Sequence, residues 1–164
     1  MSPPSYVKEQ IVSAIDHIST LVDAEIQKVT GRVVLAGFSQ GSVMAMQTVL
    51  RENSTTKVKG IAVLSGWMHD VESLSRHLSQ GGGRDAVAEE ATGVLGTESS
   101  AIFWGHGTAD EEIPLSLGRD GVSRLREVNG YVHLEFREYE GMGHTTCEAE
   151  MRDLKAWLSS LLNS

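Results

Sequence analysis

The feature that most constrains the fold of this chain is a serine between two glycines, placed after a strand-like segment and before a helix-like one. Residues 32–36 form a short apolar run of the kind found in strands buried on both faces of a parallel sheet. Residues 37–41 read Gly-Phe-Ser-Gln-Gly, the G-x-S-x-G pattern, and residues 42–51 continue with helically spaced apolar side chains. This order of strand, sharp turn and helix predicts an α/β sheet that presents one serine hydroxyl above its strands.

Strand-like and helix-like segments also alternate along the rest of the chain. Further strands are predicted at residues 58–64, 101–104 and 132–139. Further helices are predicted at residues 7–29, 115–125 and 147–161. This alternation favours an α/β fold with a parallel sheet of about four strands, flanked by helices and joined by right-handed crossovers. We expect one domain over residues 1–164, with a long, lid-like connection at residues 66–100.

The charge and cysteine content of the chain argue against several classes of function. A formal net charge of −8 would repel the phosphate backbone of nucleic acid, so we expect no nucleic-acid partner. No stretch approaches the roughly 18 apolar residues of a transmembrane helix. Cys147 is the only cysteine, and residues 1–10 lack the apolar core of a signal peptide, which favours a cytoplasmic protein. The six histidines show no metal-ligand spacing, so neither a metal nor a cofactor is expected.

Ser39, the serine of the glycine-flanked turn, is the candidate nucleophile. A sharp turn after a buried strand projects its hydroxyl above the sheet, and the N-terminus of the following helix favours negative charge there. The backbone N–H of Gln40, the next residue, is the natural donor to an oxyanion. The alternative is an ordinary glycine–serine turn in a loop, but the flanking strand and helix favour the catalytic interpretation.

A serine nucleophile needs a base, and His144 is the best placed of the six histidines. It lies in a glycine-containing loop between the last predicted strand and the last predicted helix, where parallel α/β sheets bind their ligands. The other histidines fall on a predicted helix, in the long connection, after a strand or within one: His17, His69, His77, His106 and His133. Of these, His106 suits a structural hydrogen bond.

Asp110 occupies the equivalent place after the third predicted strand, and it would accept a hydrogen bond from the Nδ1–H of His144. Glu111 and Glu112 compete for that role, although both also suit solvated charges at a helix start, and Asp110 also suits a turn or cap. The order Ser39, Asp110, His144 is the chain order of the triad in α/β-hydrolases. Because each residue follows a predicted strand, we expect the three side chains to meet at one edge of the sheet.

Several motifs in the chain are linked in a fixed order. They lie at residues 37–42 (GFSQGS), 64–67 (LSGW), 106–110 (HGTAD) with 113–114 (IP), 139–144 (YEGMGH) and 150–158 (EMRDLKAWL). Together they resemble the acyl-protein thioesterase/carboxylesterase (phospholipase-carboxylesterase) family of α/β-hydrolases, from about Tyr6 to the C-terminus with an interruption at residues 70–100. The resemblance implies the same triad, and hydrolysis of acyl thioesters such as S-palmitoyl groups on proteins, or of carboxylic esters and lysophospholipids.

The chain departs from the family pattern at two places. Family members begin with further strands, one of which ends in a His-Gly-x-Gly loop that supplies a second oxyanion donor, so we expect an N-terminally truncated sheet. Loss of one donor lowers the rate by about 10²–10³-fold. Val33, Val34 and Leu35 would then lie on an exposed apolar edge, which predicts self-association. The connection over residues 67–100 is longer than the family's and would reshape an acyl pocket.

The sequence therefore predicts a serine esterase or acyl-protein thioesterase that acts on an acylated protein, a small ester or a lysophospholipid. Trp67, Met68 and Ile113 are candidates for lining the acyl site, although they suit core positions equally well. The alternative is a truncated, catalytically silent hydrolase-like module that binds a lipid or a protein partner. The acyl chain length, the head group, the preference for thioester or oxyester and the oligomeric state do not follow from the sequence.

Overall fold

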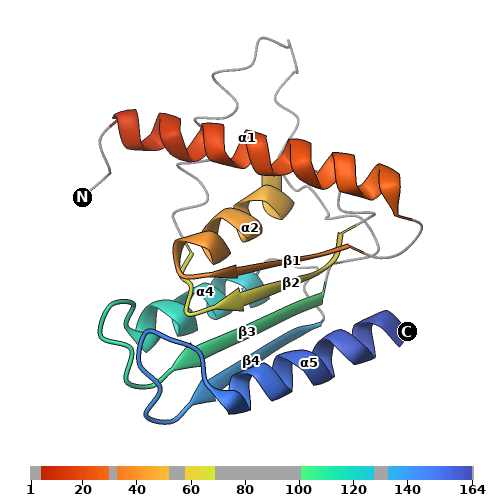
Figure 1. Ribbon diagram of the computed structural model, residues 1–164. Coiled ribbons are helices and arrows are strands. Elements are labelled where there is room, and N and C mark those ends of the chain that lie inside the picture. Colours follow the sequence, from red (N-terminus) through yellow and green to blue (C-terminus); the bar gives the residue numbers. More distant parts are fainter. Residues whose placement is uncertain (1–4, 30–32, 52–57, 69–100, 128–132, 164) are drawn as a thin grey trace.

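The computed structural model describes residues 5–29, 33–51, 58–68, 101–127 and 133–163, and its helices and strands are shown in Figure 1. The described helices are α1 (Ser5–Lys28), α2 (Gln40–Arg51), α4 (Leu115–Glu127) and α5 (Glu148–Asn163). The described strands are β1 (Val33–Phe38), β2 (Val58–Leu64), β3 (Ala101–Gly107) and β4 (Leu134–Tyr139). Most of the connection predicted to be lid-like, residues 69–100, lies outside the described residues.

The four described strands form one parallel sheet in the order β1-β2-β3-β4. Helix α2 joins β1 to β2, and helix α4 joins β3 to β4. This arrangement confirms the predicted α/β class and parallel sheet. Because the carboxyl ends of parallel strands meet at one edge, the turn after β1 and the loops after β3 and β4 share the left-hand end of the sheet in Figure 1.

Two details of the strands differ from the sequence prediction. The third strand is predicted to end at Trp104, but β3 continues to Gly107 by pairing with β4. His106 therefore lies inside the strand and not after it. A Gly-His-Gly triplet lacks the apolar run that marks a buried strand, so the sequence gives no sign of this extension. His133, predicted within a strand, lies in a turn just before β4.

Helices cover both faces of the sheet. α2 packs on β1 and β2, and α1 packs on α2 (Figure 1). α4 lies on this same face, where Gly121 lets the Trp104 ring approach the helix closely. α5 covers the opposite face, where the ring centroids of Phe103 and Trp157 lie 5.8 Å apart. The site-bearing end of the sheet is thus held by helices on two sides.

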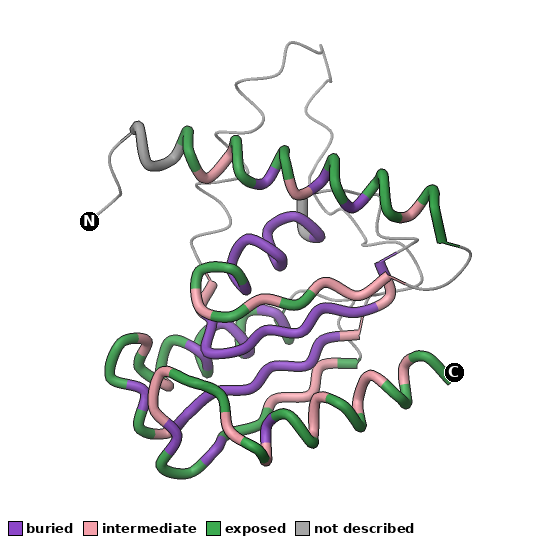
Figure 2. Tube along the Cα trace, viewed as in Figure 1, coloured by how far each residue is buried: buried purple, intermediate pink, exposed green. Residues whose placement is uncertain are grey.

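The main core lies between the sheet and the layer formed by α1, α2 and α4. Its most deeply buried side chains are apolar and come from both the strands and the helices: Met46, Ile61, Val63, Ile102, Trp104, Val122 and Leu125. Figure 2 shows that burial is nearly continuous along β2 and β3. Complete burial of one such aliphatic side chain stabilises a fold by about 1.5–3 kcal/mol. This cluster therefore anchors the central strands whose ends carry the candidate site.

The start of the C-terminal helix differs from the sequence prediction at one position. Spacings of three and four residues in the sequence put Met151 on one apolar stripe with Leu154, Leu158 and Leu161. The structure instead exposes 39% of Met151 and buries Glu150 completely. Glu150 faces Gly105 of β3, where the missing side chain leaves room for its carboxyl group. Apolar spacing places Leu154, Leu158 and Leu161 on the covered side, as the structure does. It assigns a carboxylate to solvent, however, and so misses the burial of Glu150.

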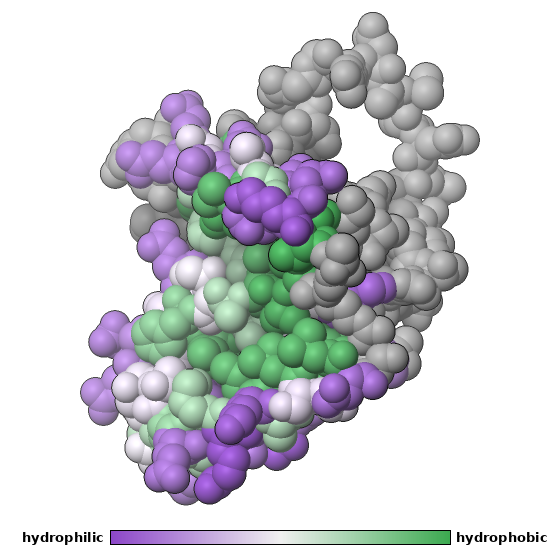
Figure 3. All heavy atoms as spheres, turned by 45° about the vertical axis from the view of Figure 1, so that its right-hand side comes forward, coloured by the Kyte–Doolittle hydropathy of each residue, from purple (hydrophilic) through white to green (hydrophobic). Residues whose placement is uncertain are grey.

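Strand β1 forms one edge of the described sheet. Its residues Val33, Val34 and Leu35 are half-buried, and Phe38 at its end is exposed. Figure 3 shows apolar side chains gathered between the polar surfaces of α1 and α5. Self-association through this edge stays a prediction. Among the described residues, no helix combines the length and apolar character needed to span a membrane.

Candidate active site

The turn between β1 and α2 holds Ser39 in a left-handed backbone conformation, with φ of 53°. The Ser39 N–H donates to the Leu64 carbonyl at the end of β2 at 2.9 Å, and its own carbonyl accepts the Ser42 hydroxyl at 2.6 Å. A non-glycine residue pays about 1–3 kcal/mol for a strained conformation of this kind, so the surrounding structure must fix it. These bonds orient the serine side chain above the sheet.

Gly37 explains why this turn needs a glycine on its strand side. A Cβ at Gly37 would collide with the backbone of Gly41 and Ser42 in the first turn of α2. The helix therefore crosses directly over the end of β1, and the turn can be as sharp as the G-x-S-x-G pattern predicts.

Hydrogen bonds join the loop after β3 to the loop after β4. The Ala109 N–H donates to the Met142 carbonyl at 3.0 Å, and the Gly141 N–H donates to Thr108 Oγ1 at 2.9 Å. A Cβ at Gly107 would collide with the Met142 carbonyl, so the loops also approach closely where β3 ends. The loop that carries Asp110 and the loop that carries His144 are therefore fixed relative to each other.

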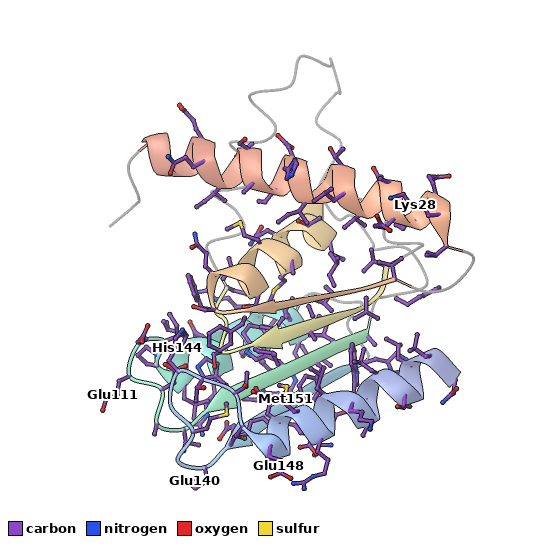
Figure 4. The ribbon with its side chains drawn as sticks, in the orientation of Figure 1. Lys28, Glu111, Glu140, His144, Glu148 and Met151 are labelled. Carbon is purple, nitrogen blue, oxygen red and sulfur yellow. The ribbon has the colours of Figure 1, made fainter. Side chains whose placement is uncertain are left out.

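The three predicted triad residues meet at this end of the sheet. His144 Nδ1 lies 2.9 Å from Asp110 Oδ2, and His144 Nε2 lies 3.0 Å from Ser39 Oγ. In the tautomer that Asp110 favours, Nδ1–H donates to the carboxylate and the Ser39 hydroxyl donates to Nε2. Figure 4 shows His144 beside the ends of the strands. Neither Glu111 nor Glu112 contacts Nδ1, so Asp110 occupies the position predicted for it.

Asp110 acts both as a turn residue and as the partner of His144. Its Oδ1 accepts backbone N–H bonds from Ile113 at 2.8 Å and from Glu112 at 3.1 Å. Burial alone raises the pKa of Asp110, but hydrogen bonds from His144 and Ile113 outweigh burial and leave the pKa below its ordinary value. The carboxylate is therefore ionised at neutral pH and able to stabilise a positive charge on His144.

His106 supports this turn from inside the protein. It is fully buried, and its Nε2 lies 2.8 Å from the Ile113 carbonyl and 3.7 Å from Asp110 Oδ2. Its Nδ1 has no hydrogen-bond partner among the described residues. The structural hydrogen bond predicted for His106 is therefore present, and it acts on the same turn that holds Asp110.

Two further residues lie beside His144: Phe38, which no sequence pattern singles out, and Glu112, which the sequence offers only as a rival to Asp110. The Phe38 ring lies against the imidazole, with 4.9 Å between ring centroids. Glu112 Oε2 lies 3.9 Å from His144 Nε2. Both contacts join segments that are distant in the sequence or depend on the turn around Asp110, so no local pattern marks them.

The weaker candidates occupy different places. Gln40 begins α2 directly after Ser39, at a position where the backbone N–H has no acceptor within the helix. Trp67 packs with Ile15 and the start of α2, and Met68 packs against the main core. Ile113 contributes to the site through its backbone N–H and carbonyl.

No arrangement of acidic, histidine or cysteine side chains suited to a metal ion occurs in the part of the chain that the structure describes. The chemical groups that the site offers are instead a hydroxyl, an imidazole and a carboxylate, linked in series. Such a series suits nucleophilic attack by the hydroxyl with the imidazole as base.

Comparison with known proteins gives consistent matches. A family described as phospholipase/carboxylesterase matches residues 2–162. Acyl-protein thioesterase 1 of Cryptococcus neoformans is 28% identical over 168 residues, which cover 94% of this chain and 63% of that protein. Carboxylesterase SOBER1 of Arabidopsis thaliana is 29% identical over 157 residues, covering 94% of this chain and 60% of that protein.

Solved structures agree with this fold. The crystal structure of Arabidopsis thaliana SOBER1 matches with a TM-score of 0.73 and 29% identity, covering 98% of this chain and 68% of that chain. That of Zea mays acyl-protein thioesterase 2 matches with a TM-score of 0.71 and 20% identity, covering 94% and 66%. These structures show the α/β-hydrolase fold. The chain spans about three-fifths of the length of the two curated relatives described above.

Proposed function

We propose that this chain, which belongs to the phospholipase/carboxylesterase family, is a serine hydrolase of acyl thioesters or carboxylic esters. The observation that carries this proposal is the linked geometry of Ser39, His144 and Asp110, with separations of 3.0 Å and 2.9 Å. The catalytically silent module is not favoured, since the relatives bear the names of hydrolases.

The proposed reaction begins when Ser39 Oγ attacks the acyl carbonyl and His144 Nε2 takes its proton. Asp110 stabilises the imidazolium, and the Gln40 N–H donates to the oxyanion of the tetrahedral intermediate. His144 then protonates the leaving thiolate or alkoxide, which departs and leaves an acyl group on Ser39. Water, activated by His144, hydrolyses this ester and restores the serine.

The proposed substrates are an acylated protein, a small ester or a lysophospholipid. Support comes from relatives named as an acyl-protein thioesterase and a carboxylesterase. We do not assign Trp67 or Met68 to the acyl site, because both pack against core clusters. Ile113 remains a candidate for the acyl site, since its backbone N–H donates to Asp110 in the turn beside His144.

We propose Gln40 as the oxyanion donor among the described residues. A site that works with one donor in place of two is slower by about 10²–10³-fold. We therefore expect a protein made of residues 1–164 alone to turn over substrate slowly. The cytoplasmic location and the self-association through β1 stay predictions.

The test is hydrolysis of a matched thioester and oxyester with the same acyl chain. Purified wild-type protein should hydrolyse at least one of them, and Ser39→Ala should reduce that rate to background while its thermal unfolding stays unchanged. Equal rates for wild type and a folded Ser39→Ala variant would overturn the proposed function. The ratio of kcat/KM for the two substrates decides between thioesterase and esterase.

A further inference from the structure

Two carboxylates approach opposite sides of the His144 imidazole. Asp110 Oδ2 lies 2.9 Å from Nδ1, and Glu112 Oε2 lies 3.9 Å from Nε2, the nitrogen that faces Ser39 Oγ. The mechanism described above uses Asp110 but assigns nothing to Glu112. Its carboxylate is therefore a charged group beside the reacting atoms that still needs a role.

The turn around Asp110 determines where Glu112 lies. The Glu112 N–H donates to Asp110 Oδ1 at 3.1 Å, and the next residue, Ile113, donates to the same oxygen at 2.8 Å. The backbone on both sides of the Glu112 side chain is therefore held to the residue that orients His144. The carboxylate itself stays at the surface, because its side chain is 76% exposed.

Glu111, the preceding residue, offers a natural comparison. It is also exposed, and it lies at the outer edge of the same loop, with His144 nearer the sheet (Figure 4). No ion pair joins it to His144 among the described contacts, whereas Glu112 has one. Two adjacent carboxylates of equal charge thus differ in their distance to the imidazole.

The position of Glu112 has a chemical consequence for the leaving group. The leaving sulfur or oxygen takes its proton from His144 Nε2, so it must come within hydrogen-bond distance of that nitrogen. Groups attached to this atom then pass within several ångströms of the Glu112 carboxylate. Unit charges at about 4 Å in a water-like medium change an equilibrium or rate by about fivefold.

The other groups around His144 do not supply a second negative charge on this side. Asp110 is buried and lies on the Nδ1 side of the His144 ring. His106 Nε2 lies 3.7 Å from Asp110 Oδ2 on that same side. Ser39 and the Phe38 ring are uncharged. Glu112 is therefore the charged group that a substrate meets at Nε2 among the described residues.

We propose that Glu112 is a specificity-determining residue that favours leaving groups carrying a positive charge and disfavours leaving groups carrying a negative charge. This inference rests on the proposed hydrolase function. An exposed ion pair contributes little to stability, but this role requires none, because the carboxylate acts on the substrate and not on the fold. Glu112 does not act as acid, base or nucleophile in this account.

The test uses three butyryl thioesters whose thiols carry a trimethylammonium group, a hydroxyl group or a sulfonate group. The kcat/KM for each is measured at low ionic strength with wild-type protein, Glu112→Gln and Glu111→Gln. We expect Glu112→Gln to lower the ratio of the cationic to the anionic substrate by about tenfold, because charges about 6 Å from the carboxylate shift each rate by about threefold and the two rates shift in opposite directions. Glu111→Gln should change this ratio by less than about twofold.

Two further measurements separate electrostatics from a change of shape. Salt of about 0.5 M should reduce the cationic preference of the wild type and leave Glu112→Gln nearly unaffected. Glu112→Lys should reverse the preference. An unchanged ratio in Glu112→Gln, or an equal change in Glu111→Gln, would overturn this inference.

The neutral hydroxyl-bearing substrate keeps the two proposals distinguishable. If Ser39→Ala hydrolyses it as fast as the wild type, the proposed function fails, and the inference fails with it. If its hydrolysis depends on Ser39 but the charge ratio does not depend on Glu112, the inference alone is wrong.

Discussion

The Thr108 side chain accepts a hydrogen bond from the Gly141 backbone N–H at 2.9 Å, and this bond joins the loop that carries Asp110 to the loop that carries His144. The two loops come from different strands and are more than thirty residues apart in the sequence. Their alignment decides whether Asp110 Oδ2 can reach His144 Nδ1.

Thr108→Val should therefore reduce kcat by about 3–10-fold with little change in KM. The substitution keeps the shape of the side chain but removes the acceptor, and a single hydrogen bond of this kind contributes about 1 kcal/mol. Thr108→Ser keeps the hydroxyl and should retain most of the activity. Steady-state kinetics check the pair, and equal kcat for Thr108→Val and Thr108→Ser would rule out this role for the hydroxyl.

Asp110→Asn should lower kcat by about 10³–10⁴-fold. The amide cannot stabilise the imidazolium, and it favours the wrong tautomer of His144. Asn fills the same space, so urea unfolding should show a folded protein. Glu111→Gln changes the neighbouring residue and is the matched control; its kcat should stay within about twofold of the wild-type value. A kcat of Asp110→Asn within about tenfold of wild type would contradict the role of Asp110 as the orienting residue.

The overall fold and the three main site residues follow from the sequence because their signals are local. A buried strand, a glycine-flanked serine and a helix stand side by side in the chain, and His144 and Asp110 each follow a strand. The neighbours of His144 are different. Phe38 and Glu112 come close to it only when three strand ends assemble. No pattern marks Phe38, and the sequence offers Glu112 only as a rival to Asp110.

The extent of β3 and the burial of Glu150 at the start of α5 also depend on tertiary structure. His106 continues a strand because β4 pairs with it, although its glycine neighbours suggest a loop. Glu150 is buried because Gly105 leaves space opposite it, whereas apolar periodicity selects Met151 for that face. In both cases a contact with another element overrides the local preference.

His106→Phe should destabilise the protein by about 1–3 kcal/mol. The change leaves the partly buried Ile113 carbonyl without its hydrogen bond from Nε2, which is 2.8 Å away. His106→Gln places an amide N–H near the same point and should recover part of that loss. Denaturant unfolding measures the stability of both variants. Equal stability of His106→Phe and His106→Gln would contradict this role of His106.

Glu150 should make the stability of the protein fall as pH rises. The carboxyl group is fully buried, and neither oxygen has a hydrogen-bond partner among the described residues. Burial raises its pKa to about 7, above the ordinary value of 4.5. The unfolded chain releases this proton at lower pH than the folded chain does, so stability declines between about pH 4.5 and pH 7 and then levels off.

Glu150→Gln should remove this decline. Relative to the wild type, the free energy of unfolding of the variant should rise by up to about 3 kcal/mol between pH 5 and pH 8. Urea unfolding at several pH values measures this difference. Glu148→Gln, in the same helical turn but exposed, serves as the control and should show no such trend. A pH-independent difference between Glu150→Gln and wild type would show that Glu150 is not held protonated by burial.

The most direct measurement of the central claim is the mass of the protein after reaction with a fluorophosphonate, followed by peptide mapping of the adduct. An activated serine attacks this reagent, whereas an ordinary serine does not. We expect one adduct per chain, located on Ser39, lost in Ser39→Ala and strongly slowed in His144→Ala. An adduct on another residue, or equal labelling of folded wild type and Ser39→Ala, would contradict the central claim.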